Sequence, residues 1–324
     1  MGRRLFLLTE KLKRLFYNMP DVLPPCLTNS NNVRFKDPVS LQKKLKALFE
    51  AGSKRLQVIS DFDYTFSKFI NEKGEKCWTT HGIFDHEANR VNANLQAQLN
   101  ELRDKYMKIE FDPDMSVEEK IPHMLIWWKT AHDRIKNAGF KKETLEIFVR
   151  DSKVELRNKC PDFLSLLESE DIPVILFSAG IGDLIEMFLS QQLGAVPKNL
   201  HLISNMMIFD EQTNEVIGWH DPLIHTFNKD SSVIQGERKF FHKLSGRDQI
   251  LLIGDSLGDV HMDVGVENEG NIIKIGFLNA NVEKMLPRYL NEYDIVLIEE
   301  LSMTVPLDII KQVIKPVHQV SAAQ

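Results

Sequence analysis

Residues 56–65 read Leu-Gln-Val-Ile-Ser-Asp-Phe-Asp-Tyr-Thr, an apolar run that ends in two carboxylates. Side chains alternate along a strand, so Asp61 and Asp63 share one face while Phe62 points away from them. Two carboxylates that converge at one point repel each other unless a cation or a difference in protonation state relieves the repulsion. The stretch therefore predicts a buried strand with an acidic site at its carboxyl end.

Two further apolar runs end in polar residues in the same way. Pro173–Phe177 leads into Ser178-Ala179-Gly180, and Gln249–Ile253 leads into residues 254–259, which read Gly-Asp-Ser-Leu-Gly-Asp. Lys229 lies between the two runs. In an open α/β sheet, ligands bind at the carboxyl ends of the strands. We therefore expect these polar residues to form one site with the two carboxylates.

From residue 172 onward, strand and helix patterns alternate, which is typical of a parallel sheet with helices on both faces. The pattern predicts further strands at Leu200–Ser204, Asn271–Ile275 and Asp294–Ile298, a hairpin over Met206–Trp219, and helices at Gly182–Gln192, Ser231–Leu244, Val282–Tyr289 and Leu307–Ile314. The expected fold class is α/β, with a doubly wound, mainly parallel sheet.

The strand pattern is absent from residues 68–171, where amphipathic stretches predict helices at Glu87–Ile109, Ser116–Ala138 and Lys142–Ser152. Ser116 and Glu119 match a capping box, which marks a helix start. We interpret residues 68–171 as a mainly helical cap inserted after the first catalytic strand. Residues 37–67 and 172–324 are then the catalytic core, and residues 1–36 an N-terminal extension and connector.

The composition is that of an ordinary globular protein, with 43% hydrophobic and 27% charged residues. A net charge of -6 argues against binding to a nucleic acid polymer. Three cysteines without metal-ligand spacing suit a reducing compartment, and no apolar run approaches the roughly 20 residues that cross a bilayer. The basic segment 1–19 could pack on the body or lie on an anionic membrane. We expect a cytoplasmic monomer without stable membrane insertion.

The order of the motifs resembles that of the haloacid dehalogenase superfamily. They are Asp-x-Asp-x-Thr at 61–65, Ser at 178, Lys at 229 and Gly-Asp-Ser-x-Gly-Asp at 254–259. Longer matches at 60–67, 117–122, 177–183, 227–229 and 254–259 resemble the cytosolic 5′-nucleotidase III family over roughly residues 41–314. The resemblance implies a haloacid dehalogenase-like core and a nucleoside 5′-monophosphate as substrate.

The resemblance also implies how phosphate is transferred. Asp61 is expected to be the nucleophile that forms an aspartyl-phosphate. Asp63 is expected to protonate the leaving oxygen and later to accept a proton from the attacking water. Lys229 offsets the charge of the phosphate, whose oxygens are held by Ser178 and the amides around Ala179. Transfer to a second nucleoside is expected as a side activity.

Carboxylates at 61, 255 and 259 make an oxygen-rich set that suits Mg²⁺, a hard cation. The resemblance implies that Asp61 and Asp255 bind the ion directly, with the backbone carbonyl of Asp63. Asp259 then acts directly or through water. Thr65 is expected to orient Asp63 or the phosphate.

The cap is expected to bind the base. By the same resemblance, Glu110 accepts from the base edge, Trp128 stacks on the ring and Phe69 forms an opposite wall. Residues 121–132 resemble the branch of the family that acts on 7-methylguanosine monophosphate, whereas pyrimidine-preferring relatives tend to carry Tyr at the place of Trp128. N7-methylguanine is a cation, and an indole ring attracts a desolvated cation by up to roughly 2 kcal/mol. We expect activity on this nucleotide and also on cytidine monophosphate.

Two other functions are compatible with parts of the sequence. A phosphatase for phosphoserine or a small sugar phosphate would use the same carboxylates, but it would not need an aromatic cap. A non-catalytic protein that binds methylated nucleotides would need the cap but not the full catalytic set, which is present here.

Overall fold

The computed structural model describes residues 23–28, 30–112, 114–230, 233, 244, 246–264 and 270–315. The predicted features at 1–19 lie outside these residues, and so does the predicted helix Ser231–Leu244 apart from its residues 233 and 244. Among the described helices, none is long and apolar enough to span a membrane.

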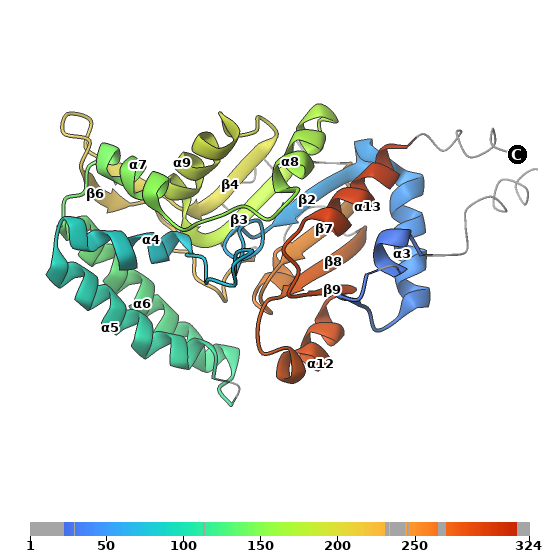
Figure 1. Cartoon of the computed structure of the whole chain (residues 1–324), viewed down its shortest axis with the longest axis horizontal. Coiled ribbons are helices and arrows are strands. Elements are labelled where there is room, and N and C mark those ends of the chain that lie inside the picture. The colour runs from blue at the N-terminus through green and yellow to red at the C-terminus, as the bar shows by residue number, and fades with distance from the viewer. Residues whose placement is uncertain are drawn as a thin grey trace, which may run out of the picture.

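Within the described residues, seven strands form one central sheet (Figure 1). In spatial order they are β1 (Val33–Arg34), β9 (Ile295–Ile298), β8 (Asn271–Leu278), β7 (Gln249–Gly254), β2 (Leu56–Ser60), β3 (Val174–Ile181) and β4 (Leu200–Asn205). All neighbouring pairs are parallel except β1 with β9. The predicted α/β class with a mainly parallel sheet is confirmed.

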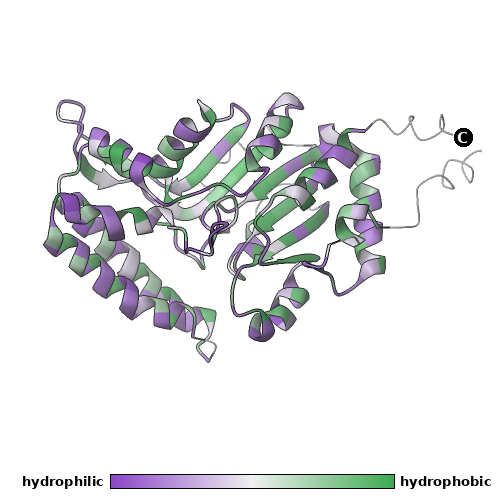
Figure 2. Cartoon of the chain, viewed as in Figure 1, coloured by the Kyte–Doolittle hydropathy of each residue, from purple (hydrophilic) through white to green (hydrophobic). Residues whose placement is uncertain are grey.

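The strands of the sheet consist mostly of hydrophobic residues (Figure 2). In β2, Val58 belongs to a hydrophobic cluster with α3 (Pro38–Ala51), α8 (Cys160–Ser169), α9 (Gly182–Leu193) and α13 (Thr304–Ile314). Its neighbour Ile59 belongs to a second cluster with α12 (Val282–Glu292). Because successive side chains of a strand point to opposite faces, helices cover both sides of the sheet. This is the doubly wound arrangement.

The inserted segment contains α4 (Thr80–Glu87), α5 (Ala93–Glu110), α6 (Val117–Asn137) and α7 (Lys142–Asp151). Helices α5 and α6 lie side by side away from the sheet (Figure 1). The capping box at the start of α6 is present, with Ser116 and Glu119 each bonded to the other's backbone. The predicted hairpin is also present as β5 (Met207–Phe209) and β6 (Val216–Trp219), and β6 lies against α6.

The helix predicted over Glu87–Ile109 is wrong at its start. The chain turns after α4, and Asn92 begins α5 by accepting from the backbone amides of Asn94 and Leu95. A short polar side chain that caps a new helix outweighs the continuous amphipathic pattern. β1 was not predicted: it lies in the expected connector and pairs with β9. Two residues are too few for a period-2 pattern to be visible.

The predicted cap shares hydrophobic contacts with the core. Phe84 of α4 and Leu145 of α7 belong to the same hydrophobic cluster as Val58 of the central strand. Helix α8, which falls within residues 68–171, packs in that cluster through Phe163. The division of the chain at residues 68 and 171 stays a prediction.

Candidate active site

The sheet order brings the three motif-bearing strands together. β2 lies between β3 and β7, in parallel with both. The backbone amide of Asp61 donates to the carbonyl of Ile253 at 3.0 Å, which joins the first acidic turn to the end of β7. The residues that follow these strands therefore meet at one edge of the sheet.

Lys229 lies between two carboxylates at this edge. Its Nζ is 2.5 Å from Oδ1 of Asp61 and 2.8 Å from Oδ1 of Asp259, and all three side chains are at most 5% exposed. Burial opposes the charge on Lys229, but Asp259 and Asp61 outweigh it and raise the pKa of the ammonium. Burial raises the pKa of Asp61 to about 7 in spite of Lys229. The three groups form a buried charge cluster that depends on all its members.

Asp259 also orders the loop in which it lies. Its Oδ2 accepts from the amides of Asp255 and Ser256, at 3.1 and 2.9 Å, and from the Ser256 hydroxyl at 2.9 Å. With Oδ1 on Lys229, both oxygens of Asp259 already accept hydrogen bonds. Asp259 is therefore better suited to act on a bound cation through water or through Lys229 than to contact the ion directly.

The acidic cluster fits a divalent cation. One carboxylate oxygen from each of Asp61, Asp255 and Asp259 lies within 4.8 Å of the others. Burial, with the charges of Asp259 and Asp61, raises the pKa of Asp255 well above its ordinary value, because nothing else nearby offsets the repulsion fully. Hard oxygen ligands of this kind suit Mg²⁺ or Ca²⁺, so the residues present could hold such an ion.

Asp63 is held by the start of α4. Its two carboxylate oxygens accept from the backbone amide of Thr80 at 2.8 Å and from the Thr80 hydroxyl at 2.7 Å. Burial raises the pKa of Asp63 to about 6, although these hydrogen bonds pull it down. A carboxyl group that titrates near neutral pH suits a general acid and base.

The carboxyl end of β3 approaches Asp63 closely. A Cβ atom at Gly180 would lie 2.9 Å from Oδ2 of Asp63 and 2.4 Å from the hydroxyl of Thr80, so a side chain would not fit there. The pairing of β3 with β4 shifts register between Phe177 and Ile181, which re-aims the backbone at this end of the strand toward the site. Ser178 accepts from the Gly180 amide at 3.0 Å.

Thr65 lies in the same buried region. Its Oγ1 has no hydrogen-bond partner among the described residues. A buried hydroxyl without a partner is costly, which is consistent with a phosphate contact for this side chain.

The two predicted base-binding residues reach the core. Trp128 Nε1 donates to the carbonyl of Ala179 at 3.0 Å, and Glu110 accepts from the Thr226 hydroxyl at 2.6 Å. Burial raises the pKa of Glu110, and Thr226 opposes the shift. Trp128 and the ring of His225 are 6.4 Å apart, so both cap residues face the loop that leads to Lys229.

Phe69 has a different neighbour. Its ring packs edge-to-face against Tyr64, with centroids 4.9 Å apart, and among the ring contacts of the described residues it is not paired with Trp128. Its role as an opposite wall for the base stays a prediction.

Some residues that build the site were not predicted. Thr80 positions Asp63 from the start of α4. Asn205 donates to the carbonyls of Ala179 and Ile224, at 2.9 and 2.8 Å, and so joins the end of β3 to the loop before Lys229. The Thr-Thr pair at a helix start is a sequence signal for the first. We find no local signal for Asn205, because its partners are distant in sequence.

Comparisons with known proteins support this interpretation. The chain matches the family model of pyrimidine 5′-nucleotidases (UMPH-1) over residues 64–314. A protein of Caenorhabditis elegans named as a cytosolic 5′-nucleotidase 3 is 45% identical over 303 residues, which are 93% of this chain and 80% of the relative. The 7-methylguanosine phosphate-specific 5′-nucleotidase A of Xenopus laevis is 40% identical over 275 residues, which are 85% of this chain and 93% of the relative.

A solved structure is also similar. The crystal structure of cytosolic 5′-nucleotidase IIIB bound to cytidine superposes with a TM-score of 0.80 at 30% sequence identity. The superposition covers 89% of this chain and 95% of that chain.

Proposed function

The chain belongs to the pyrimidine 5′-nucleotidase family, and we propose that it is a Mg²⁺-dependent hydrolase of nucleoside 5′-monophosphates that acts on 7-methylguanosine and cytidine monophosphates. The observation that carries the proposal is the buried cluster of Lys229 with Asp61 and Asp259 at the carboxyl edge of the sheet. Names of the relatives support the two substrates, since one is specific for 7-methylguanosine phosphate and another was crystallised with cytidine.

In the proposed mechanism, Asp61 attacks phosphorus and forms an aspartyl-phosphate while the bond to the 5′ oxygen breaks. Lys229 lies 2.5 Å from the attacking carboxylate and offsets the charge of the incoming phosphate. Ser178 and the amides around Ala179 at the end of β3 would hold the other phosphate oxygens. Thr65 would satisfy its buried hydroxyl on the phosphate.

Asp63 serves both halves of the reaction. It gives its proton to the departing 5′ oxygen, and it then takes a proton from the water that hydrolyses the aspartyl-phosphate. Thr80 fixes the orientation of the carboxyl group through two hydrogen bonds. A pKa raised to about 6 by burial lets Asp63 exchange a proton near neutral pH.

Mg²⁺ would be held by Asp61 and Asp255, with Asp259 acting through water and through Lys229. When bound, the ion supplies positive charge against the phosphate and against the repulsion of the carboxylates. The donor set is made of oxygen only, which supports Mg²⁺ over softer metals.

The cap would select the base. Trp128 and Glu110 both lie against core loops that border the phosphate site. A positively charged 7-methylguanine would stack on the indole ring and present its donors to the carboxylate of Glu110. Unmethylated guanine lacks the cation, so it should bind less well. We also propose that the protein is a monomer. We propose that it works in the cytosol, which the name of the nematode relative supports.

Phosphate release from 7-methylguanosine, guanosine, cytidine and uridine monophosphates tests the proposal. We expect turnover of the methylated guanosine and of cytidine monophosphate with Mg²⁺, none with EDTA, and none with Asp61→Asn. Asp133→Asn changes an exposed carboxylate of α6 and should act like the wild type. Turnover of phosphoserine but of no nucleotide would overturn the proposal.

A further inference from the structure

Arg157 is a buried cation far from any predicted site residue in sequence. Its side chain is 0% exposed. The guanidinium donates to the carbonyls of Thr65 and Tyr64, at 2.7 and 2.5 Å, and to the carbonyl of Glu300. It also donates to Oδ1 of Asn279 at 2.8 Å.

The acceptors that the structure describes for this guanidinium are all neutral oxygens. Desolvation lowers the pKa of Arg157 to about 10, which leaves it charged at neutral pH. A buried charge is costly unless it is paired or fully hydrogen-bonded. The centre of the guanidinium also lies 3.8 Å from the centroid of the Phe277 ring, a cation–π contact. This single arginine thus contacts two carbonyls of the catalytic loop, one amide side chain and one aromatic ring.

The catalytic loop needs such support. Tyr64, between Asp63 and Thr65, has a φ of 63°. An aromatic residue in this left-handed region is strained and persists only where the surroundings hold it. The Tyr64 amide donates to Ser67 Oγ at 2.8 Å, and its carbonyl accepts from both Arg157 and Asn279. These bonds fix the peptide planes on both sides of Tyr64, and the first of these planes carries the carbonyl of Asp63.

The same group reaches the acidic cluster. Asn279 Nδ2 donates to Oδ2 of Asp255 at 3.3 Å while its Oδ1 accepts from Arg157. Arg157 is therefore connected to the backbone of the nucleophile loop and to a carboxylate of the cation site.

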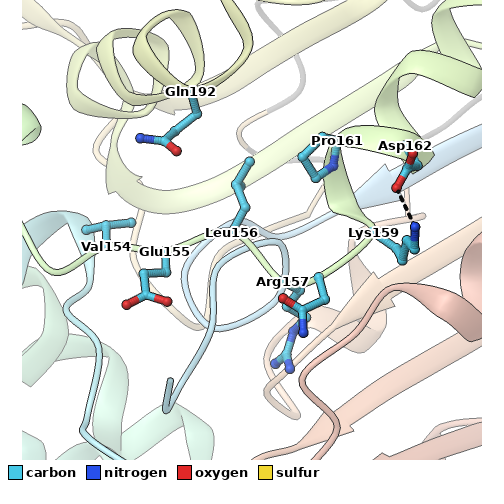
Figure 3. A pocket seen from close by; sticks show the side chains of 9 residues that line it. Val154, Glu155, Leu156, Arg157, Lys159, Pro161, Asp162 and Gln192 are labelled. Atoms are coloured by element: carbon cyan, nitrogen blue, oxygen red, sulfur yellow. Dashed lines mark ion pairs between the residues drawn. The ribbon is translucent and has the colours of Figure 1, made fainter. Parts of the chain in front are cut away.

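Arg157 belongs to the linker that returns from the inserted helices to the core. This linker runs beside the outgoing one: the amide of Lys68 donates to the carbonyl of Glu155, and the amide of Arg157 to the carbonyl of Phe66, both at 2.8 Å. In Figure 3 the side chains of Leu156 and Arg157 point in opposite directions. The linker also lines a hollow of about 620 Å³, together with Pro161, Asp162 and Gln192 (Figure 3).

We propose that Arg157 is a positioning residue: it sets the backbone of residues 63–65 and the carboxylate of Asp255 for the cation and the phosphate. This inference rests on the proposed function for its consequence in catalysis. Its structural part, that the guanidinium prepares the cation site, can be tested without turnover.

The test uses Arg157→Lys, which keeps a positive charge but loses the planar fork that serves several acceptors at once. Arg247→Lys is the matched control. Arg247 likewise donates to three backbone carbonyls, those of Ser53, Leu56 and Asp171, at the opposite ends of the strands. Asn279→Ala is a second test variant, because it removes the link to Asp255 and leaves the arginine in place.

Titration calorimetry with Mg²⁺ on the full chain, without nucleotide, gives the affinity of the cation site. We expect Arg157→Lys and Asn279→Ala to weaken Mg²⁺ binding by about 10-fold or more, as for other residues that orient metal ligands. Arg247→Lys should lower the melting temperature but leave the Kd for Mg²⁺ unchanged. With nucleotide, the first two variants should need more Mg²⁺ for half-maximal rate, and saturating Mg²⁺ should restore part of kcat.

Two outcomes separate the inference from the proposed function. If Arg157→Lys and Asn279→Ala bind Mg²⁺ as the wild type does and only melt earlier, as the control does, Arg157 is structural and the inference is overturned. If the wild type binds Mg²⁺ but hydrolyses no nucleotide, and the variants bind the ion more weakly, the proposed function fails while the inference stands.

Discussion

The edge of the sheet and the inserted helices contribute to the site in different ways. At the edge, Asp61, Lys229 and Asp259 form a buried chain of ion pairs, and Asp63 is held through both of its oxygens. From the helices, Trp128 and Glu110 each reach the core through one described side-chain hydrogen bond. Several hydrogen bonds and ion pairs hold the residues at the edge of the sheet, whereas Trp128 and Glu110 make few polar contacts with the core.

This difference suggests a division of labour. Groups that must be held within a fraction of an ångström for phosphoryl transfer come from strand ends. In the proposed function, the groups that discriminate between bases come from α5 and α6, and each meets the core through one described side-chain hydrogen bond. Substitutions at the edge should therefore reduce the rate with every substrate, and substitutions in the helices should change the ranking of substrates.

Asp63→Asn should give the largest effect. The variant cannot protonate the 5′ oxygen or activate water, so kcat on nucleotides should fall by ~10²–10⁴-fold. With p-nitrophenyl phosphate, whose leaving group needs no proton, a rapid burst of nitrophenolate should precede slow turnover. Stopped-flow absorbance measures both phases. Asp85→Asn, at a partly buried carboxylate of α4 paired with Arg103, is the control; equal losses on both substrates without a burst would contradict the assignment.

Lys229→Met should come next. It removes the charge that offsets Asp61 and the phosphate, and kcat should fall by ~10²–10³-fold. It also leaves two buried carboxylates without their partner, so the free energy of unfolding should fall by about 3–5 kcal/mol. Urea unfolding and phosphate release measure the two effects. Lys68→Met changes another buried lysine, which is paired with two glutamates. This variant should lower the free energy of unfolding but leave the rate at saturating Mg²⁺ unchanged.

A stack of rings that joins the inserted helices to the hairpin should make their attachment depend on pH. His132 of α6 stacks on Trp219 of β6 at 3.7 Å and on His81 of α4 at 6.0 Å. Desolvation lowers the pKa of His81 to about 4 and that of His132 to about 3. Below pH 6.5 the unfolded chain binds protons that the folded chain excludes, so this contribution to stability is complete above pH 6.5 and is lost as the pH falls toward 4.

His132→Gln tests this dependence. Each histidine should contribute a slope of ~1.4 kcal/mol per pH unit over that range. The difference in unfolding free energy between wild type and variant should therefore shrink by about 2 kcal/mol from pH 6.5 to pH 5, since carboxylate effects are common to both. His220→Gln changes an exposed histidine and serves as control. A difference that does not change with pH would show that the pKa of His132 is not lowered in the folded chain.

Trp128→Tyr should give the smallest effect on rate and the clearest effect on ranking. The phenol ring attracts a cation less than indole, so kcat/KM for 7-methylguanosine monophosphate should fall by about 10-fold relative to that for cytidine monophosphate. Trp127→Tyr, at the neighbouring ring that stacks on Tyr106, should leave the ratio unchanged. Equal falls for both nucleotides would indicate that Trp128 only supports the fold.

The sequence predicted the residues at the carboxyl edge of the sheet more accurately than the bounds of the inserted helices. Apolar runs that end in Asp61, Ser178 and Asp255 are local patterns, and parallel strands bring their ends together whatever the rest of the chain does. The resemblance to the 5′-nucleotidase III family is confirmed by the comparisons. The roles of individual residues stay proposals.

What the sequence did not predict are contacts between distant polar side chains. Thr80 meets Asp63 across 17 residues, and Arg157 meets Asn279 across 122. Such pairs have no periodicity, because each depends on where two separate segments end in space. The break before α5 was missed for a different reason: a capping side chain at Asn92 overrides an amphipathic pattern that continues through it.

The most direct test of the division of labour compares 7-methylguanosine monophosphate with ribose 5-phosphate, which has the phosphate and sugar but no base. We expect the wild type to prefer the nucleotide in kcat/KM by at least ~10²-fold, because binding energy from the base is used at the reacting centre. The double variant Glu110→Ala with Trp128→Ala should lose most of this preference while its rate on ribose 5-phosphate stays close to that of the wild type. If the double variant keeps the preference, or loses both activities equally, the inserted helices do not select the base and the account is contradicted.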